Sequence, residues 1–435
     1  MKTFFLGITL TCLLVSGGLR AQGFDEKIQD IFQAALDTRL LGLGQSGRNF
    51  SLSNNQLSRA TLDGFVDILQ TGVTHFPAGA TATGLSFDFS NGVPVTETQS
   101  LGPIFAERAA TLGKGRFNVG FLSNYLNYQT LRGQKLSDLT FVFTHNDIGL
   151  SGLGDMPAEW DRVELAMNLG IRATIFSFVG TVGISDRIDL GVALPFLSVK
   201  VQSDPVATLV SQTYLQSGVA NFYYGGSETA PELSTVLPGI NEEASGLGDL
   251  VLRGKYHFVK DNRLDLAAMA QLSLATGDAA NFLGSGEGYL KLGVIGSTHY
   301  GNMTPHVNLF YQRASGGSRG DELALYLGYD HQVNPAFTLA VDVLSEFQIH
   351  PIEEGYRLPG SVEYRQEVSN NVTYRRRVPL SNIPFWERDH YVNAAFGIKY
   401  SPREDMIILS NLLLPLNSGG LRTALTPSLG FDFSF

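Results

Sequence analysis

The sequence has little cysteine and little charge. Cys12 is the only cysteine among 435 residues, and Asp, Glu, Lys and Arg together make up 17%. Cys12 lies in an apolar segment that we expect to be removed, so the mature chain has no thiol for a disulfide or for a cysteine-based zinc or redox site. The formal net charge is −10, and the basic residues are scattered, which excludes a nucleic-acid-binding surface.

Long apolar runs are missing after the first 21 residues. Lys2, the apolar residues 4–15 and the small residues before Ala21 predict a secretory signal peptide, residues 1–21, that is cleaved after Ala21. Beyond it, no stretch reaches the roughly 18 apolar residues expected of a transmembrane helix. In a membrane the chain must therefore form a closed barrel, because lipid cannot hydrogen-bond the backbone of an open sheet.

Alternation of apolar and polar residues dominates from about Gly115 to the C-terminus. Residues 250–258 place Leu252 and Tyr256 on an apolar face, and residues 264–274 repeat the pattern after a polar turn. Short polar turns separate such segments at 185–187, 260–263, 301–304, 334–336 and 402–405, whereas residues 202–245 and 350–389 form long connections. Outer-membrane barrels have short periplasmic turns and longer extracellular loops. The pattern thus predicts a periplasmic end that carries the short turns.

The predicted fold is all-β, a transmembrane antiparallel up-and-down barrel of about 14 strands, with a range of about 12 to 16. We assign residues 111–435 to the barrel and expect a hairpin turn near Arg172-Ala173, where no Gly, Pro or Asn marks it. Helical spacing of apolar residues in 25–40 and 62–69 predicts two short helices. Residues 22–110 are expected to form a helical or irregular plug, or a periplasmic segment.

Three segments resemble a family of outer-membrane barrels named after the meta-pathway of phenol degradation. They are residues 105–117 (FAERAATLGKGRF), 185–195 (SDRIDLGVALP) and 245–256 (SGLGDLVLRGKY), the last followed by Ala275-Thr276-Gly277-Asp278. The resemblance implies an outer-membrane barrel that passes hydrophobic or aromatic compounds. The layout is also similar to that of the long-chain fatty-acid transporters, whose N-terminal hatch plugs the lumen, on architecture alone.

Alternation points nine charged side chains of both signs into the predicted lumen. These lumen-lining candidates are Asp189, Asp249, Arg253, Lys255, Asp265, Lys291, Asp342, Glu346 and Lys399. They can orient a permeating solute by facing one another across a constriction. They can equally pair between neighbouring strands and merely fill a narrow barrel.

The C-terminal segment alternates and ends on an aromatic residue. Phe431, Phe433 and Phe435 resemble the signal that outer-membrane barrels present to the barrel assembly machinery. Arg375-Arg376-Arg377 offers a contact to lipopolysaccharide phosphates, although a solvated charge run explains it better. No nucleophile motif supports an enzyme, and no histidine spacing indicates a metal site. We expect no cofactor.

The function predicted from these patterns is an outer-membrane channel or transporter for small, hydrophobic or aromatic molecules that cross the lumen passively. The partners expected are outer-membrane lipid, lipopolysaccharide, the assembly machinery and a small-molecule solute. The alternative is a structural or surface-binding barrel without an open pore.

Overall fold

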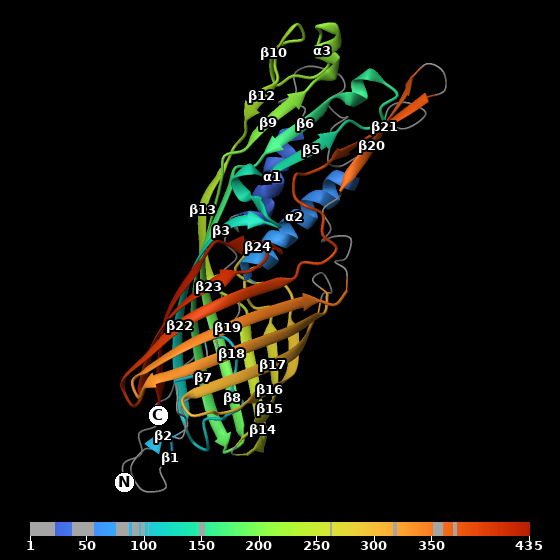
Figure 1. Ribbon diagram of the computed structural model, residues 1–435. Coiled ribbons are helices and arrows are strands. Elements are labelled where there is room, and N and C mark those ends of the chain that lie inside the picture. Colours follow the sequence, from blue (N-terminus) through green and yellow to red (C-terminus); the bar gives the residue numbers. More distant parts are fainter. Residues whose placement is uncertain are drawn as a thin grey trace.

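Twelve antiparallel strands form a closed barrel (Figure 1). The computed structural model describes residues 22–36, 56–74, 87–88, 95–96, 101–102, 104–147, 153–261, 263–315, 320–350, 360–368 and 372–435. The barrel strands are β3 (Phe117–Leu131), β7 (Leu169–Ser185), β8 (Ile188–Ser203), β14 (Leu250–Lys260), β15 (Asp265–Leu274), β16 (Tyr289–Ser297), β17 (Met303–Ala314), β18 (Glu322–Asn334), β19 (Phe337–Gln348), β22 (Tyr391–Arg403), β23 (Met406–Pro415) and β25 (Thr426–Ser434). The ring closes where β25 pairs with β3.

The strand count corrects the prediction of about fourteen, although twelve lies within the range given. Alternation reports only that a strand is half-buried, and four further strands alternate outside the barrel. These are β5 (Thr140–Thr144), β6 (Arg162–Ala166), β9 (Val206–Val210) and β12 (Ser234–Val236), which form a separate four-stranded sheet. The hairpin turn expected at Arg172-Ala173 is also wrong. β7 runs unbroken through it, and β6 leads into β7 in the same direction, because Ala166 pairs with Val206 and Leu169 with Ser203 in one register. Asn168, between the two strands, adopts a φ of 45° that asparagine tolerates.

All five short turns predicted from the sequence are confirmed. They join β7 to β8, β14 to β15, β16 to β17, β18 to β19 and β22 to β23. They lie at the end of the barrel where the chain also finishes (Figure 1), and we call this the short-turn end. The opposite end, which we call the wide end, carries the four-stranded sheet and β13 (Ile240–Leu247), and β13 extends the barrel wall along the far half of β8.

Two amphipathic helices fill the wide end. They are α1 (Phe24–Leu36) and α2 (Gln56–Thr74), and their apolar sides form one core with the four-stranded sheet and the inner faces of β3, β7 and β8. Phe32 of α1 lies 4.8 Å from Phe141 of β5 and 6.2 Å from Phe65 of α2, measured between ring centroids. Within the described residues, no helix is both long and apolar enough to cross a membrane.

The remaining elements are short helices and strands outside the barrel, the four-stranded sheet and the two helices. At the wide end they include α3 (Gln212–Ser217), β10 (Gly225–Ser227), β11 (Ala230–Glu232), β20 (Ser361–Val368), β21 (Val372–Pro379) and the 3-10 helix η4 (Pro157–Trp160). Others are β1 (Phe87–Asp88), β2 (Val95–Thr96), β4 (Gln134–Lys135), the 3-10 helix η3 (Leu136–Asp138) and β24 (Leu421–Thr423). β24 continues the pairing of β3 beyond β25.

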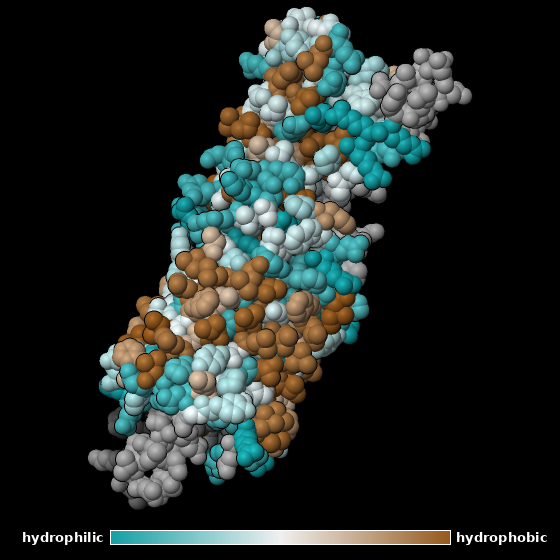
Figure 2. All heavy atoms as spheres, in the orientation of Figure 1, coloured by the Kyte–Doolittle hydropathy of each residue, from teal (hydrophilic) through white to brown (hydrophobic). Residues whose placement is uncertain are grey.

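A belt of apolar side chains covers the outside of the barrel. Each of the twelve strands contributes at least one large apolar side chain that is 41–52% exposed: Val119, Phe178, Val192, Leu252, Leu272, Leu292, Leu309, Leu327, Leu339, Ile398, Leu412 and Leu429. On the face seen in Figure 2, apolar side chains gather over the barrel, and the wide end is more hydrophilic. The alternation seen in the sequence thus sends apolar residues outward and polar residues inward.

Candidate functional site

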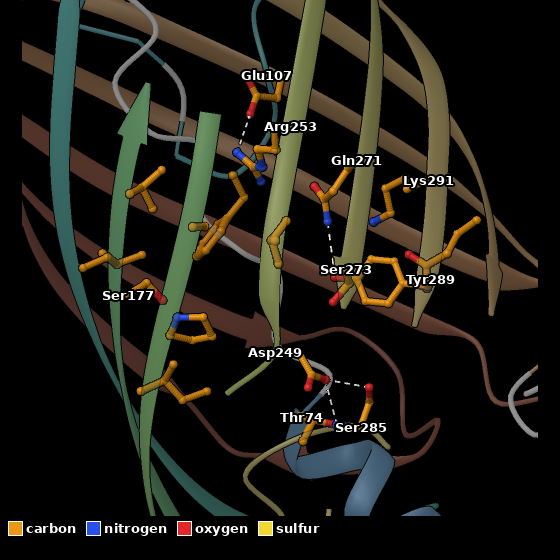
Figure 3. Close-up of a pocket in the computed structure, with 18 of the residues that line it drawn as sticks. Thr74, Glu107, Ser177, Asp249, Arg253, Gln271, Ser273, Ser285, Tyr289 and Lys291 are labelled. Carbon is orange, nitrogen blue, oxygen red and sulfur yellow. Dashed lines mark hydrogen bonds and ion pairs between the residues drawn. The ribbon is translucent and has the colours of Figure 1, made fainter. Parts of the chain in front are cut away.

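The barrel lumen encloses a cavity of about 190 Å³, which we call the chamber (Figure 3). Ile104, Phe105 and Glu107 close it toward the short-turn end. Its other end is formed by Thr71 and Thr74 at the end of α2 and by Leu283, Ser285 and Glu287 of the β15–β16 connection. We call that connection, residues 275–288, the inner loop. The N-terminal part of the chain therefore bounds the chamber at both ends.

The side walls of the chamber differ in polarity. One wall is apolar and is built by β7, β8 and β14, with Ile175, Val179, Ala193, Leu197 and Val251. The wall of β15 and β16 is polar and holds Gln271, Ser273, Tyr289 and Lys291, side by side in Figure 3. Lys291 lies 3.4 Å from the Tyr326 hydroxyl, which donates a 2.6 Å hydrogen bond to Glu346. Inward positions of neighbouring strands thus form an amphipathic space.

An irregular segment, described at residues 101–102 and 104–112, crosses the lumen between the chamber and the short-turn end, and we call it the crossing segment. Irregular backbone within a barrel needs hydrogen-bond partners, since buried amide groups are costly when unsatisfied. Asp342 accepts hydrogen bonds from the Phe105 and Ala106 amides at 2.6 and 3.0 Å. Asn308 accepts from the Glu107 amide at 2.6 Å and donates back to the Glu107 carbonyl at 2.8 Å. Inward side chains thereby replace the sheet partners that this backbone lacks.

Ion pairs reinforce the crossing segment. Arg108 pairs with Asp330, and both side chains are buried. Glu107 faces Arg253 at 3.2 Å and Lys255 at 3.6 Å. Removing one member of a buried pair typically costs about 3–5 kcal/mol, because the other charge is left without compensation. The charges along this part of the lumen therefore hold the crossing segment in place.

The structure divides the nine lumen-lining candidates into three groups. Asp249, Arg253, Lys291 and Glu346 line the chamber. Asp189, Lys255, Asp342 and Lys399 bind the backbone of the crossing segment, at Leu112, Arg108, Phe105 with Ala106, and Leu101 respectively. Asp265 contacts neither and lies 3.0 Å from His257. Their part in selecting a solute stays a prediction.

Asp249 connects two of the sequence segments quoted above, residues 245–256 and residues 275–278. Its carboxylate accepts hydrogen bonds from the Gly277 amide at 3.0 Å and from the Ser285 amide and hydroxyl at 2.8 and 2.6 Å. The Thr276 hydroxyl donates to the Gly248 carbonyl at 3.0 Å. These bonds fold the inner loop into the lumen, where Phe282 is fully buried 5.7 Å from Phe24 of α1.

Sequence reasoning missed the inner loop and the end of α2 as parts of the site. Gly277-Asp278 by itself is typical of a turn and predicts no place in the lumen. A usable signal was present in Phe282-Leu283, an apolar pair within a connection that is otherwise rich in glycine and polar residues. An apolar pair in an exposed loop is unfavourable, so the loop has to fold against other apolar residues.

The C-terminal aromatic residues lie on β25. Phe431 and Phe433 are partly buried, and Phe435 is 71% exposed. The Phe435 backbone exchanges hydrogen bonds of 2.8 and 3.0 Å with Phe117 at the start of β3. The last residue of the chain thus completes the pairing that closes the barrel. Recognition by the assembly machinery stays a prediction.

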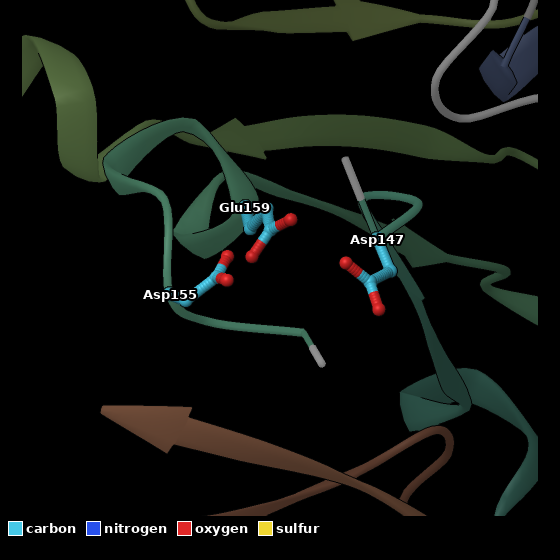
Figure 4. Close-up of side chains that lie close together, drawn as sticks. All are labelled: Asp147, Asp155 and Glu159. Atoms are coloured by element: carbon cyan, nitrogen blue, oxygen red, sulfur yellow. The ribbon is translucent and has the colours of Figure 1, made fainter. Parts of the chain in front are cut away.

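Three carboxylates gather near the 3-10 helix η4 at the wide end (Figure 4). Oxygens of Asp147, Asp155 and Glu159 lie within 4.8 Å of one another. Glu159 is fully buried and accepts hydrogen bonds from the Gly154 amide at 2.5 Å and the Met156 amide at 3.3 Å. These bonds fix the turn that leads into the 3-10 helix, which explains Glu159 structurally.

No model of a known protein family matches the chain, and no curated protein does. Solved structures that it resembles include an outer-membrane channel from Pseudomonas putida, with 14% identity over 75% of this chain and 98% of that chain and a TM-score of 0.40. A FadL homologue from Pseudomonas aeruginosa has 9% identity over 82% and 97%, with a TM-score of 0.33. The toluene transporter TodX from P. putida has 9% identity over 76% and 92%, with a TM-score of 0.32. These similarities are too low to carry an argument about function, and the phenol-degradation family stays a prediction.

Proposed function

We propose that this chain is an outer-membrane channel that lets small molecules with apolar surface cross passively through the barrel, and that it is closed in the conformation described. The observation that carries the proposal is an amphipathic chamber inside a closed barrel whose outer face is apolar. A catalytic role is not needed to account for this arrangement.

The apolar belt supports a membrane location. Soluble monomers rarely expose contiguous apolar patches larger than a few hundred Å². Twelve strands that each present at least one exposed large apolar side chain form a surface that lipid stabilises and water does not. The short-turn end then faces the periplasm, and the wide end, with Arg375, Arg376 and Arg377 exposed on β21, faces the lipopolysaccharide.

Two parts of the N-terminal region, together with the inner loop, act as the plug in this proposal. The crossing segment closes the lumen toward the periplasm, and α1, α2 and the inner loop close it toward the outside. Passage therefore requires both closures to open. The hydrogen bonds that Asp342 accepts from the crossing segment make it the residue to change first.

A barrel without an open pore is the second candidate, and the structure contains an observation that favours it. Charges of both signs fill the lumen beside the crossing segment, where buried His306 lies 3.4 Å from Asp330 and 3.7 Å from Asp342. Such a filled lumen is expected of a barrel that serves as a scaffold or a surface receptor. The same experiment separates the two functions.

Conductance of the purified, refolded protein in a planar bilayer tests the proposal. Asp342→Asn keeps the shape of the side chain but loses its charge, which weakens two hydrogen bonds by about 1–2 kcal/mol in total. We expect the open fraction to rise roughly 5- to 30-fold. Glu404→Gln, in the exposed turn between β22 and β23, is the matched control and should behave as the unaltered protein.

A variant lacking residues 22–110 removes α1, α2 and most of the crossing segment and should give large, stable openings. If this variant folds as a barrel, judged by heat-modifiable migration, and neither it nor Asp342→Asn ever conducts, the channel is ruled out. The structural or binding function then holds.

A further inference from the structure

A row of inward polar side chains leads out of the chamber. Six residues on six adjacent strands are direct cross-strand neighbours, and we call them the polar row: Arg253, Gln271, Lys291, Gln312, Glu322 and Gln348. The first four line the chamber, and Gln348 ends β19 at the wide end. Because barrel strands are tilted, a line of direct neighbours climbs along the barrel as it passes round it. The polar row therefore connects the chamber with the wide end.

The polar row continues by hydrogen bonds. Gln312 donates to Glu322 at 3.2 Å, and Gln348 accepts from the Asp389 amide at 2.7 Å. Within the chamber, Gln271 donates to the Tyr289 hydroxyl at 3.2 Å. Amides and hydroxyls both donate and accept, so they suit a ligand group that does the same. A solute with a group that donates and accepts hydrogen bonds finds a hydrogen-bonding side chain at each strand between the wide end and the chamber.

The charges around the chamber disfavour an ionic ligand. The charged lining residues are Arg253, Lys291, Glu107, Asp249, Glu287, Glu346 and Asp432, which are two cations and five carboxylates. Both cations already face carboxylates, Arg253 with Glu107 at 3.2 Å and Lys291 with Glu346 at 3.9 Å. An anion would have to displace these partners in a site of negative formal charge. A cation would have to displace donors that the carboxylates already have, since Glu107 pairs with Arg253, Asp249 accepts from the Ser285 hydroxyl and Glu346 accepts from the Tyr326 hydroxyl.

The size of the chamber limits the ligand as well. A dry cavity of about 150 Å³ accepts one benzene ring. At about 190 Å³, the chamber has room for one six-membered ring with a single small substituent. The apolar wall, with Val179 and Leu197, covers the body of such a molecule, and the polar wall faces its substituent.

We propose that the chamber is a binding site for an uncharged molecule of about one ring, whose single hydrogen-bonding group is held by Gln271 and Tyr289. This inference rests on the proposed channel function for its biological meaning, and it names the class of solute. The polar row supplies the route by which that group reaches the chamber from the wide end.

Three probes of one size test the inference: cyclohexanol, cyclohexanecarboxylate and cyclohexylammonium. Binding to the full-length, detergent-solubilised protein is measured by titration calorimetry against a micelle blank. We expect cyclohexanol to bind most tightly of the three. Gln271→Leu removes the amide and should weaken cyclohexanol binding about three- to tenfold. Gln216→Leu, exposed on α3, is the matched control and should change nothing.

Several outcomes overturn the inference. It is wrong if either ion binds more tightly than cyclohexanol, if cyclohexanol does not bind, or if Gln271→Leu binds it as well as the unaltered protein does. If Asp342→Asn conducts but the protein does not bind cyclohexanol, the proposed channel function is supported and the proposed class of solute is wrong. If the protein binds cyclohexanol through Gln271 but never conducts, the proposed binding site is supported and the proposed channel function is wrong.

Discussion

Gly72 shows how closely a single residue ties α2 to the barrel. A Cβ atom at this position would lie 2.5 Å from the Cβ of Leu421 on β24, which is too close for any side chain. The Tyr128 hydroxyl donates to the carbonyl of the next residue, Val73, at 3.2 Å. The last turn of α2, which bounds the chamber, can dock only because residue 72 has no side chain.

Gly72→Val is therefore expected to push the end of α2 away from β24 and to open the chamber toward the wide end. Overpacking of this kind costs about 1–3 kcal/mol. The measurement is single-channel conductance, with Gly360→Val as a control for the loss of a glycine in general, because Gly360 is exposed and an added Cβ there meets no atom within 4 Å. Unchanged conductance of Gly72→Val would show that α2 does not gate the lumen.

Asp67 of α2 makes a second prediction at this scale. Burial, and after it the negative charges of Asp63 and Glu287, raises the pKa of Asp67 from 3.8 to about 6. The folded state thus holds a proton that the unfolded state has lost. The contribution of Asp67 to stability is therefore greatest below about pH 4 and is lost as the pH rises through about 6.

Asp67→Asn should therefore raise the urea midpoint at pH 8 and have little effect at pH 4. Partial exposure of the side chain and solvent screening reduce the effect below the full value of the shift. Tryptophan fluorescence reports the transition, since Trp160 stacks on Tyr364 in the wide end. An equal gain at both pH values would contradict the assignment to Asp67.

At the scale of elements, alternation predicts a strand well and its partner poorly. The five hairpins with a short polar turn were predicted correctly, because each is a local unit whose two strands are joined by that turn. The hairpin expected at Arg172-Ala173, which has no such turn residues, was wrong. The barrel start at about Gly115 lies close to Phe117, where β3 begins, and the two helices expected near 25–40 and 62–69 are α1 and α2. The strands of the four-stranded sheet have the same pattern as barrel strands, so only long-range pairing distinguishes them.

The site was harder to predict than the elements. Period-two alternation assigns Asp342 and Lys399 to the lumen, but it does not reveal that they bind a backbone segment more than two hundred residues away in sequence. The crossing segment has no regular period of its own. Its position depends on inward groups from many strands, and no local pattern encodes that.

β25 offers a test of the predicted assembly signal. Deletion of Phe435 removes two hydrogen bonds to Phe117 and the exposed terminal ring. We expect markedly less heat-modifiable barrel in the outer membrane, measured by gel mobility of membrane fractions. Phe435→Tyr keeps an aromatic end and should restore assembly. If the deletion assembles normally, the C-terminal signal is not required.

For the whole molecule, the position of the crossing segment constrains how the protein forms. Residues 101–112 immediately precede β3, the first strand of the ring, whereas β25, the strand that closes it, is last in the chain. Closure therefore joins strands about three hundred residues apart, the kind of non-local contact that makes folding slow. The walls have to be wrapped around residues 101–112 before the final seam is made. The hydrogen bonds between the barrel wall and the crossing segment therefore also guide the assembly of the wall. A variant that weakens them is expected to assemble more slowly as well as to open more often.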